Sequence, residues 1–471
     1  MKEQFWKDHN NKQLAEWQKD IEDKSNSPTF CVLPWIHMAT RPNGDMRLCC
    51  GANASGAGIN PTVGIIKDSD GQHANFGNQT PMEAWNSQYM KDVRKNMLAG
   101  KISESCQKCF SEEARGISSK RIWEHNYWQD EHVDIQELIR ETLEDGTAPE
   151  RIQYLDLRLG HTCNLKCVMC SPHDSSQWVG DYYKLKKLTD DKVIHSQMHW
   201  ERKNFNNKWH ENPQFWEEMY KQIPNVKQVY FAGGEPLMIR EHKQFIQEII
   251  NQGYEKNIVL RYNTNGLLID EDIIELWSKF KRVQVGFSLD GTDERNHFIR
   301  YPSNWETVER NLELLDNTPE NIDVTIATCL NVLNIKHLPD FVKWKINKKY
   351  KKINTRTNKE GLVIGGGIVN IHLVYMPTFL EMRLLPKEHK QDVEKRFAEL
   401  KQWLWDNYTQ DDAFWKDNPY GWRRYEGVLD FMNSEDKTDL LPNFKNYITK
   451  MELIRNTNFK KTFPELADLI D

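Results

Sequence analysis

Three cysteines a third of the way along the chain have a spacing that suits a metal cluster. Cys163, Cys167 and Cys170 form the pattern Cys-x3-Cys-x2-Cys, directly after an apolar, strand-like run at residues 152–159. Iron–sulfur clusters usually take four cysteines, so three without a fourth nearby predict a four-iron cluster with one iron open to another ligand. An open coordination position is typical of a catalytic metal. Three buried thiols, or a zinc loop completed by His161 or His173, are the alternatives.

A second set of cysteines precedes this loop and consists of Cys31, Cys49, Cys106 and Cys109. Residues 30–37 and 46–50 are predicted as strands joined by a hairpin-like turn, which would bring the first two of these cysteines together. Thr80, Pro81 and Glu83 have the spacing of a capping box with a first-turn proline, so we expect a helix that leads the chain towards the last two. Four thiolates suit a closed iron–sulfur cluster, and tetrahedral zinc is the alternative.

Strand-like and helical patterns alternate through the middle of the chain. The six strand-like runs are residues 152–159, 227–232, 258–263, 283–288, 323–328 and 368–375. Such alternation predicts an α/β fold with a parallel sheet. Turns rich in glycine and polar residues follow the second, third and fourth runs, namely Gly233-Gly234-Glu235-Pro236, Thr264-Asn265-Gly266 and Ser288-Leu289-Asp290-Gly291. Because functional groups gather at the carboxyl ends of parallel strands, we expect these turns to lie near the cysteine loop.

The cysteine spacing and the turns, in this order, resemble the radical S-adenosylmethionine (radical SAM) superfamily. The resemblance implies a partial (βα)6 barrel and a 4Fe-4S cluster on Cys163, Cys167 and Cys170. It also implies that S-adenosylmethionine chelates the open iron and is cleaved by one electron to a 5'-deoxyadenosyl radical, which takes a hydrogen atom from the substrate. One departure is Met169, which stands where relatives commonly carry an aromatic residue against the adenine.

The same resemblance implies roles for residues in the turns. The motif at residues 233–236 matches GGEP, which holds the amino group of S-adenosylmethionine in relatives. Asn265 lies in a turn that faces the cofactor. Ser288 and Arg300 are expected to reach the ribose hydroxyls and the carboxylate, since a guanidinium can bind both carboxylate oxygens. Asp290 is interpreted as a residue that closes its turn.

The amino-terminal cysteines resemble the auxiliary-cluster module called SPASM or twitch, in which a Gly-x4-Cys hairpin and a later Cys-x2-Cys bind a second 4Fe-4S cluster. Gly44 to Cys49 matches the hairpin piece, which favours Cys49 over Cys50 as ligand. In most relatives the module follows the radical domain, whereas here it precedes it. Zinc at this site stays open as the alternative.

These patterns divide the chain into three predicted parts. Residues 1–149 form an auxiliary iron–sulfur module with a helical connector, and residues 150–378 form the partial barrel. Residues 379–471 form a carboxyl-terminal helical region, because apolar residues recur there at helical spacing. An aromatic-rich insertion at residues 171–226 is interpreted as helices that cover the barrel edge, or as a lid over the substrate.

Cys329 follows the fifth strand-like run and belongs to neither cysteine set. A lone cysteine of this kind is usually a small buried apolar residue. Its place at a strand end leaves one alternative, that it donates a hydrogen atom to a substrate radical. Cys329 is therefore the one candidate for a catalytic side chain.

The glycine run Gly365-Gly366-Gly367 is interpreted as a turn.

Charge and composition restrict the partners. With 63 Lys and Arg against 69 Asp and Glu, the net charge of −6 gives no general reason to expect a polyanion partner. The basic run from Lys343 to Lys359 is interpreted as solvated surface, with RNA modification as a minority alternative. Without a signal peptide or a long apolar run, we expect a cytoplasmic protein with no membrane contact. The expected partners are a peptide or small-molecule substrate and an electron donor such as flavodoxin or ferredoxin; a non-catalytic iron–sulfur electron carrier or redox sensor is the alternative function.

Overall fold

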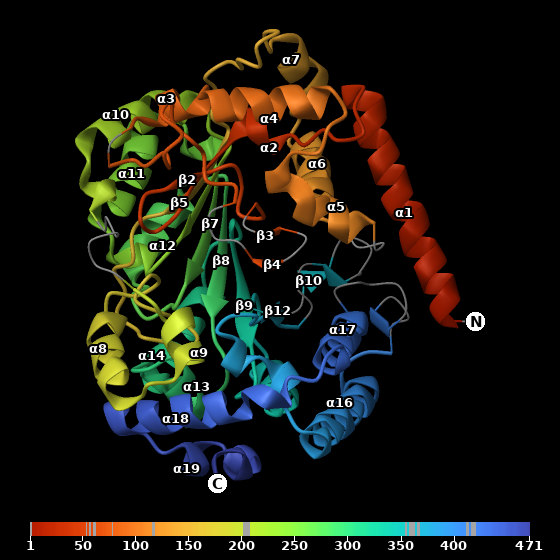
Figure 1. The fold of residues 1–471 in the computed structure, drawn as a ribbon, viewed down its shortest axis with the longest axis vertical. Coiled ribbons are helices and arrows are strands. Elements are labelled where there is room, and N and C mark those ends of the chain that lie inside the picture. Colours follow the sequence, from red (N-terminus) through yellow and green to blue (C-terminus); the bar gives the residue numbers. More distant parts are fainter. Residues whose placement is uncertain are drawn as a thin grey trace. The chain divides into compact units, whose positions relative to one another are not determined.

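The computed structural model describes residues 2–52, 54–55, 58–59, 63–77, 79–114, 118–200, 208–353, 356–357, 363–364, 368–410, 414–415 and 421–471. The chain divides into two compact units. Unit 1 comprises Met1–Gly160, Asn206–Gly233 and Arg240–Leu260, and unit 2 comprises His161–Phe205, Gly234–Ile239 and Arg261–Asp471. Figure 1 shows the ribbon of the chain.

The sheet strands of unit 1 are β1 (His37–Thr40), β2 (Met46–Arg47), β5 (Tyr154–Arg158) and β6 (Gln228–Ala232). Their order is β6-β5-β1-β2, and all are parallel to their neighbours except β2, which pairs antiparallel with β1. Ala39 lies opposite Arg47 on one side and opposite Asp156 on the other. Asp156 in turn lies opposite Tyr230, so these four residues form one row across the sheet. The short strands β3 (Ala54–Ser55) and β4 (Gly58–Ile59) pair separately.

The helices of unit 1 surround this sheet with aromatic side chains. They are α1 (Lys2–Ser25), α2 (Leu33–Ile36), α3 (Pro81–Trp85), α4 (Gln88–Leu98), α5 (Gln107–Glu113), α6 (Lys120–Asp130), α7 (Ile135–Arg140), α10 (Pro213–Gln222) and α11 (Arg240–Asn251). Trp35, Trp85, Trp128 and Trp209 are fully buried and belong to the core of this unit. Helix α1 packs on α6 and α7, and its Asp20 accepts a hydrogen bond from the His125 ring.

Two local predictions for unit 1 need correction. The strand expected over residues 30–37 is wrong, because residues 33–36 form α2 and strand β1 begins only at His37. Pro34 lies in the first turn of α2, where a missing N–H is tolerated. The helix expected from Thr80 towards Gly100 is two helices, α3 and α4, although Thr80 and Glu83 form the predicted capping box.

Unit 2 contains the parallel strands β8 (Arg282–Ser288), β9 (Ile322–Leu330) and β12 (Asn370–Leu373), in the order β12-β9-β8. Strand β7 (Val259–Thr264) runs across the division between the units. The helices beside these strands are α8 (Trp178–Leu188), α9 (Lys192–Gln197), α12 (Glu271–Ser278), α13 (Asp293–Ile299), α14 (Trp305–Asp316) and α15 (Leu338–Asn347). Strands β10 (Arg356–Thr357) and β11 (Val363–Ile364) form a separate pair.

The carboxyl-terminal region is helical, as predicted. It contains α16 (Lys387–Asn407), α17 (Trp422–Asn433), α18 (Leu441–Arg455) and α19 (Phe459–Thr462). In Figure 1, α18 crosses close to α8 and α9, and contacts between these helices agree with that view. Each of the six predicted strands has its counterpart in β5, β6, β7, β8, β9 and β12, which confirms the α/β class with a mostly parallel sheet.

The structure leaves the predicted domain boundaries untested. The domain boundaries at residues 149 and 378 stay predictions, and the turn at residues 365–367 lies outside the described residues. Within the insertion, α8, α9 and α10 are helical, as expected for helices that cover the barrel edge. Over the described part of the chain, no helix is both long enough and apolar enough to span a bilayer.

Candidate functional site

The loop with the three cysteines lies in unit 2, between strand β5 and helix α8. Cys163 and Cys167 are 8% and 7% exposed and form one cluster with Leu165, against which Met169, Cys170 and Leu267 pack. A hydrogen bond joins the thiols of Cys167 and Cys170. The structure therefore brings the three predicted cluster ligands together inside a shell of apolar side chains.

Backbone hydrogen bonds from a distant segment fix the shape of this loop. The N–H groups of Lys166 and Val168 donate to the carbonyls of Tyr301 and Ile299, at 2.7 and 2.8 Å. Trp178 donates from Nε1 to the carbonyl of Cys167 at 2.7 Å. These bonds satisfy the polar backbone of a buried loop that has no regular secondary structure.

Three side chains that the sequence did not single out also hold the loop. Asp181 is 2% exposed and accepts hydrogen bonds from Lys166 Nζ at 2.8 Å and from Arg455 Nε at 2.9 Å. Tyr447 of α18 donates its hydroxyl to the carbonyl of Val168 at 2.7 Å. Helical periodicity could have marked Tyr447 and Arg455 only as parts of α18, because their partners are far away in the sequence.

Arg300 is a charged group that lies beside Cys167. It is 7% exposed, pairs with Asp290 at 2.8 Å, and places Nη1 4.0 Å from the sulfur of Cys167. The hydrogen bond from Cys170, opposed by burial and assisted by Arg300, lowers the pKa of Cys167. The cation beside this thiol favours its ionised form.

Asp290 and Cys329 belong to the same cluster. Asp290 is 1% exposed, and its Oδ1 accepts the backbone N–H of Cys329 at 2.7 Å. Asp290 therefore ties the end of β9 to its own turn and holds Arg300. Burial raises the pKa of Cys329 to about 12, so this thiol is neutral at physiological pH. Its role as a hydrogen donor stays a prediction.

Close backbone approach explains both glycines of the Gly233-Gly234-Glu235-Pro236 turn. Gly233 has φ +115°, and a Cβ there would lie 3.0 Å from the carbonyl oxygen of Gly160. A Cβ on Gly234 would collide with the backbone of Thr162, which precedes the first cysteine of the loop. Pro236 starts a 3₁₀ turn, Pro236–Met238.

Glu235 is a buried carboxylate without a charged partner. It is 1% exposed and accepts three hydrogen bonds, from Thr264 Oγ1 at 2.7 Å and from the N–H groups of Asn265 and Leu237 at 2.8 and 3.2 Å. None of the partners described for this carboxylate carries a positive charge. Burial, partly offset by these hydrogen bonds, raises the pKa of Glu235 to about 7.

The turn after β7 joins the same group. Asn265 donates from Nδ2 to Oδ1 of Asn164, inside the cysteine loop, at 2.7 Å. Thr264 and Asn164 are thus two further site residues that the spacing of the cysteines did not reveal. Ser288 ends β8 and is half-buried, while Asn265 is 9% exposed.

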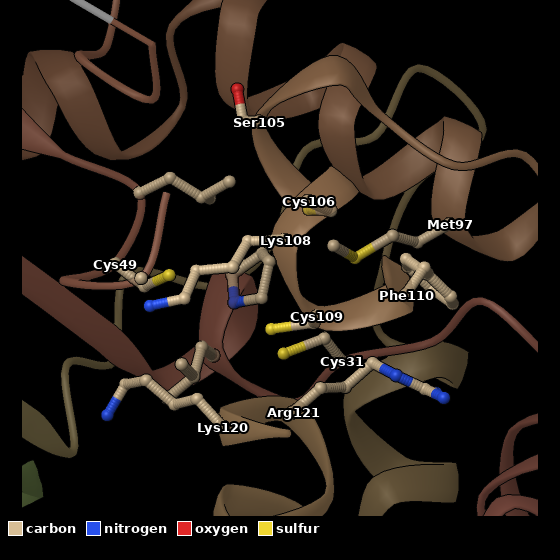
Figure 2. A pocket seen from close by; sticks show the side chains of 14 residues that line it. Cys31, Cys49, Met97, Ser105, Cys106, Lys108, Cys109, Phe110, Lys120 and Arg121 are labelled. Carbon is tan, nitrogen blue, oxygen red and sulfur yellow. The ribbon is translucent and has the colours of Figure 1, made fainter. Parts of the chain in front are cut away.

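The four amino-terminal cysteines line one pocket in unit 1 (Figure 2). Cys31 precedes α2, Cys49 follows β2, Cys106 ends a 3₁₀ turn (Glu104–Cys106), and Cys109 lies in α5. Figure 2 shows the four sulfur atoms around the pocket together with the cationic side chains of Lys120 and Arg121. The described lining includes Cys49 and not Cys50.

Burial controls the chemistry of these four thiols. It raises the pKa of every one of them, that of Cys106 to about 12. At Cys31 the charges of the other three thiolates add to this effect, so the four groups face one another. A metal centre that replaces the protons removes this mutual repulsion, and the donor set fits such a group.

The thiols are not gathered around a single point. Tetrahedral zinc with Zn–S bonds of 2.3 Å needs sulfur atoms about 3.8 Å apart. Among the described residues, no three His, Cys, Asp or Glu side chains form a group that could hold one metal ion.

Comparisons with curated proteins give two kinds of relative. Over 208 residues the chain is 24% identical to an uncharacterized protein of Methanocaldococcus jannaschii. The aligned region covers 43% of this chain and 62% of that protein. Over 149 residues it is 26% identical to the GTP 3',8-cyclase of Clostridium botulinum. The aligned region covers 31% of this chain and 37% of the cyclase. The chain therefore spans less than two thirds of the length of each.

Solved structures with some similarity include native anSMEcpe with bound AdoMet, at 19% identity and a TM-score of 0.36, covering 54% of this chain and 61% of that one. Another is SuiB of Streptococcus suis bound to S-adenosylmethionine, at 14% identity and a TM-score of 0.30, covering 64% of this chain and 58% of that one.

Models of protein families match two separate parts of the chain. Residues 31–110 match the SPASM domain, an iron–sulfur cluster-binding domain. The matched range contains all four amino-terminal cysteines, so the match favours an iron–sulfur cluster over zinc at this site. Residues 157–344 match the radical SAM superfamily and contain the three-cysteine loop, Glu235 and Arg300. The chain thus carries a radical SAM domain, with its 4Fe-4S cluster and S-adenosylmethionine, preceded by an auxiliary iron–sulfur SPASM domain.

Proposed function

We propose that this chain is a radical SAM enzyme that oxidises or otherwise modifies a peptide or small molecule. When bound, the cluster and S-adenosylmethionine supply one-electron cleavage to a 5'-deoxyadenosyl radical, which abstracts a hydrogen atom from the substrate. The residues of this chain bind and orient these groups, and they exclude water from the site. Cys163, Cys167 and Cys170 would hold the cluster.

The buried carboxylate of Glu235 is the observation that carries this proposal. A carboxylate that is 1% exposed, with a pKa raised to about 7 and no cationic partner among those described, is unfavourable unless a ligand donates hydrogen bonds to it. The amino group of S-adenosylmethionine is such a donor. Glu235 reaches the cysteine loop through its own N–H, which donates to the carbonyl of Thr162 at 2.8 Å.

Arg300, Ser288 and Asn265 complete the proposed cofactor site. Arg300 would bind the carboxylate of S-adenosylmethionine while Asp290 keeps its guanidinium in place. Asn265 would stay oriented by its hydrogen bond to Asn164. These roles follow from chemistry and placement, and each can be tested by substitution.

The pocket with four cysteines supports a second role for the SPASM domain. With all four irons ligated by protein, the auxiliary cluster would accept an electron from the substrate radical rather than bind the substrate. Such a reaction needs an external one-electron donor for each S-adenosylmethionine cleaved, for which flavodoxin or ferredoxin is suited. A peptide or small-molecule substrate agrees with the absence of a strong net charge of either sign.

The direct test is anaerobic reconstitution of the full chain with iron and sulfide, followed by S-adenosylmethionine and a chemical reductant. We expect 5'-deoxyadenosine and methionine from the wild type and none from Cys167→Ala. Cys329→Ala is the matched control, because it removes a thiol from the same cluster of residues and should retain 5'-deoxyadenosine formation. No product from the wild type, or undiminished product from Cys167→Ala, would refute the proposal.

A further inference from the structure

Among the described residues of unit 1, three arginines are buried, and the guanidinium groups of two of them are well satisfied by hydrogen bonds. Arg94 is 0% exposed and donates hydrogen bonds to three backbone carbonyls and to Asn86. Arg121 is 3% exposed, pairs with Glu113 and donates to two backbone carbonyls. Both arginines therefore hold parts of the fold together through bonds within the protein.

Arg47 is different. It is 8% exposed, and its Nε and Nη2 atoms are buried without any hydrogen-bond partner among the described residues. A buried guanidinium whose N–H groups are unsatisfied is costly, and native proteins rarely retain one without a reason. The missing partner must be a group that accepts hydrogen bonds, and an anion satisfies both the charge and the donors.

The position of Arg47 on the sheet indicates where such a ligand would lie. Residues directly opposite on paired strands share a face, so Arg47, Ala39, Asp156 and Tyr230 form one row on a single face of the unit 1 sheet.

The next row on that face consists of His37, Tyr154 and Gln228. It also contains buried polar atoms with no partner among the described residues, namely Nε2 of His37 and both side-chain polar atoms of Gln228. His37 is neutral, because burial lowers its pKa to about 4. Its Nε2 and the Gln228 amide are therefore free to bond a polar ligand without adding charge.

Among the described residues, no carboxylate forms an ion pair with Arg47. Asp156 already pairs with Arg158 at 3.4 Å. Asp45, two residues before Arg47, accepts hydrogen bonds from Asn43 and Asn75, at 2.8 Å each. Besides burial, the positive charges of Arg41 and Arg158 lower the pKa of Arg47, whereas the thiols of Cys49 and Cys50 act in the opposite direction.

We propose that Arg47 binds an oxyanion of a ligand, a carboxylate or a phosphate, in a polar site to which His37 of the neighbouring strand β1 contributes. A planar guanidinium can bind two oxygens of either group at once, which orients the ligand as well as binding it. The inference that the substrate carries an anionic group rests on the proposed function. The inference that unit 1 has an anion-binding site is independent of that function.

The test uses the full chain with both clusters reconstituted anaerobically and no reductant, so that no turnover occurs. Thermal unfolding is followed while acetate or inorganic phosphate is titrated at constant ionic strength, because a ligand of the native state raises the unfolding midpoint. We expect at least one of the two anions to raise the midpoint of the wild type. Arg47→Met should weaken the binding of that anion by roughly tenfold or more, since it removes a charge-assisted pair of hydrogen bonds.

Two control variants separate ligand binding from folding. Arg140→Met removes an exposed positive charge from α7 of the same unit and should keep the anion response of the wild type. Arg94→Met removes a guanidinium with four hydrogen bonds and should lower the unfolding midpoint without anion. Arg47→Met without anion should unfold at the wild-type midpoint or above, because it removes an unsatisfied buried charge.

The outcomes divide clearly. A response to acetate alone assigns a carboxylate, and a response to phosphate alone assigns a phosphoryl group. The proposal is overturned if neither anion raises the wild-type midpoint, if Arg47→Met keeps the anion response, or if this variant loses as much stability as Arg94→Met. It is also overturned if the variant only shifts the reduction potential of the cluster beside Cys49. Failure to form 5'-deoxyadenosine would leave the anion response intact and would count against the proposed function alone.

Discussion

The two cysteine sites are built in opposite ways. In unit 2, three thiols come from one short loop, and apolar side chains of the loop itself, Leu165 and Met169, pack with them together with Leu267. In unit 1, four thiols come from four different local structures, and they meet only because α2, β2 and α5 fold around one pocket. A local motif therefore prepares the first site, whereas the second exists only in the folded domain.

The two cysteine sites also differ in the pKa shifts of their thiols. In the loop the three thiols differ: the hydrogen bond from Cys170, with help from Arg300, lowers the pKa of Cys167, whereas the pKa of Cys163 is raised to about 12 and that of Cys170 is raised well above its usual value. In the auxiliary pocket burial raises the pKa of all four thiols, although Lys120 opposes this at Cys49 and Arg121 at Cys106. Metal binding at the auxiliary site must therefore displace more protons than metal binding at the loop.

Removal of one auxiliary ligand should separate the two sites most clearly. In Cys106→Ala we expect the iron content of the reconstituted chain to fall from about eight to about four per chain, because only the loop cluster remains. Formation of 5'-deoxyadenosine with chemical reductant should persist, since the radical SAM loop keeps its three thiols. Iron analysis and product quantification on the same sample provide the test. Loss of both clusters together would show that the sites are not independent.

The choice between Cys49 and Cys50 refines the composition of the auxiliary site. Cys49 lines the pocket, so Cys49→Ala should lose the auxiliary cluster as Cys106→Ala does. Cys50→Ala should keep full iron content and an unchanged visible absorption spectrum. The reverse result would assign the fourth ligand to Cys50 and would move the chain around the pocket by one residue.

Asp181 tests whether the loop of unit 2 depends on its distant anchors. Asp181→Asn leaves Lys166 and the buried Arg455 without their shared carboxylate, so we expect the free energy of unfolding to fall by about 3 kcal/mol. Denaturant unfolding of the metal-free chain measures this loss. In the reconstituted chain the auxiliary iron should be retained. A loss below about 1 kcal/mol would indicate that the loop is held mainly by its backbone hydrogen bonds.

The smallest effect concerns the pH dependence of cofactor binding. Because the pKa of Glu235 is raised to about 7, its protonated form is favoured in the folded chain, and its contribution to stability is lost as pH rises through 7. Binding of S-adenosylmethionine needs the ionised form and should therefore strengthen by roughly tenfold between about pH 6 and pH 8.

Equilibrium dialysis with the unreduced, reconstituted chain measures this dependence. Glu235→Gln should bind weakly and without this increase, which also corrects for the titration of the ligand itself. An equal increase in the variant would mean that Glu235 does not control binding.

Much of the site in unit 2 could be predicted from the sequence alone. The spacing of Cys163, Cys167 and Cys170, and the turn with Glu235 after the second strand, are local patterns with a direct chemical meaning. The alternation of strands and helices also predicted the α/β class correctly, because periodicity reports which face of each element is buried. Asp290 was expected only to close its turn, yet it also holds Arg300, which lies ten residues further along the chain.

The amino-terminal part shows the opposite limit. The predicted hairpin is present, because β1 pairs antiparallel with β2, but residues 33–36 next to Cys31 are helical, and β1 also joins β5 in parallel. Such pairing depends on a partner more than a hundred residues away, which no local pattern contains.

The sequence by itself determined the kinds of chemical site in this protein, because cysteine spacing and glycine-rich turns are properties of a short piece of chain. Only the tertiary structure decided how these sites are held and what else they can bind. Tyr447 and Arg455 secure a loop nearly three hundred residues before them. Arg47 looks like an ordinary strand residue in the sequence, and its unsatisfied guanidinium appears only when β2 takes its place on the sheet. Burial and hydrogen bonding are set by the whole fold, and they turn a residue type into a site.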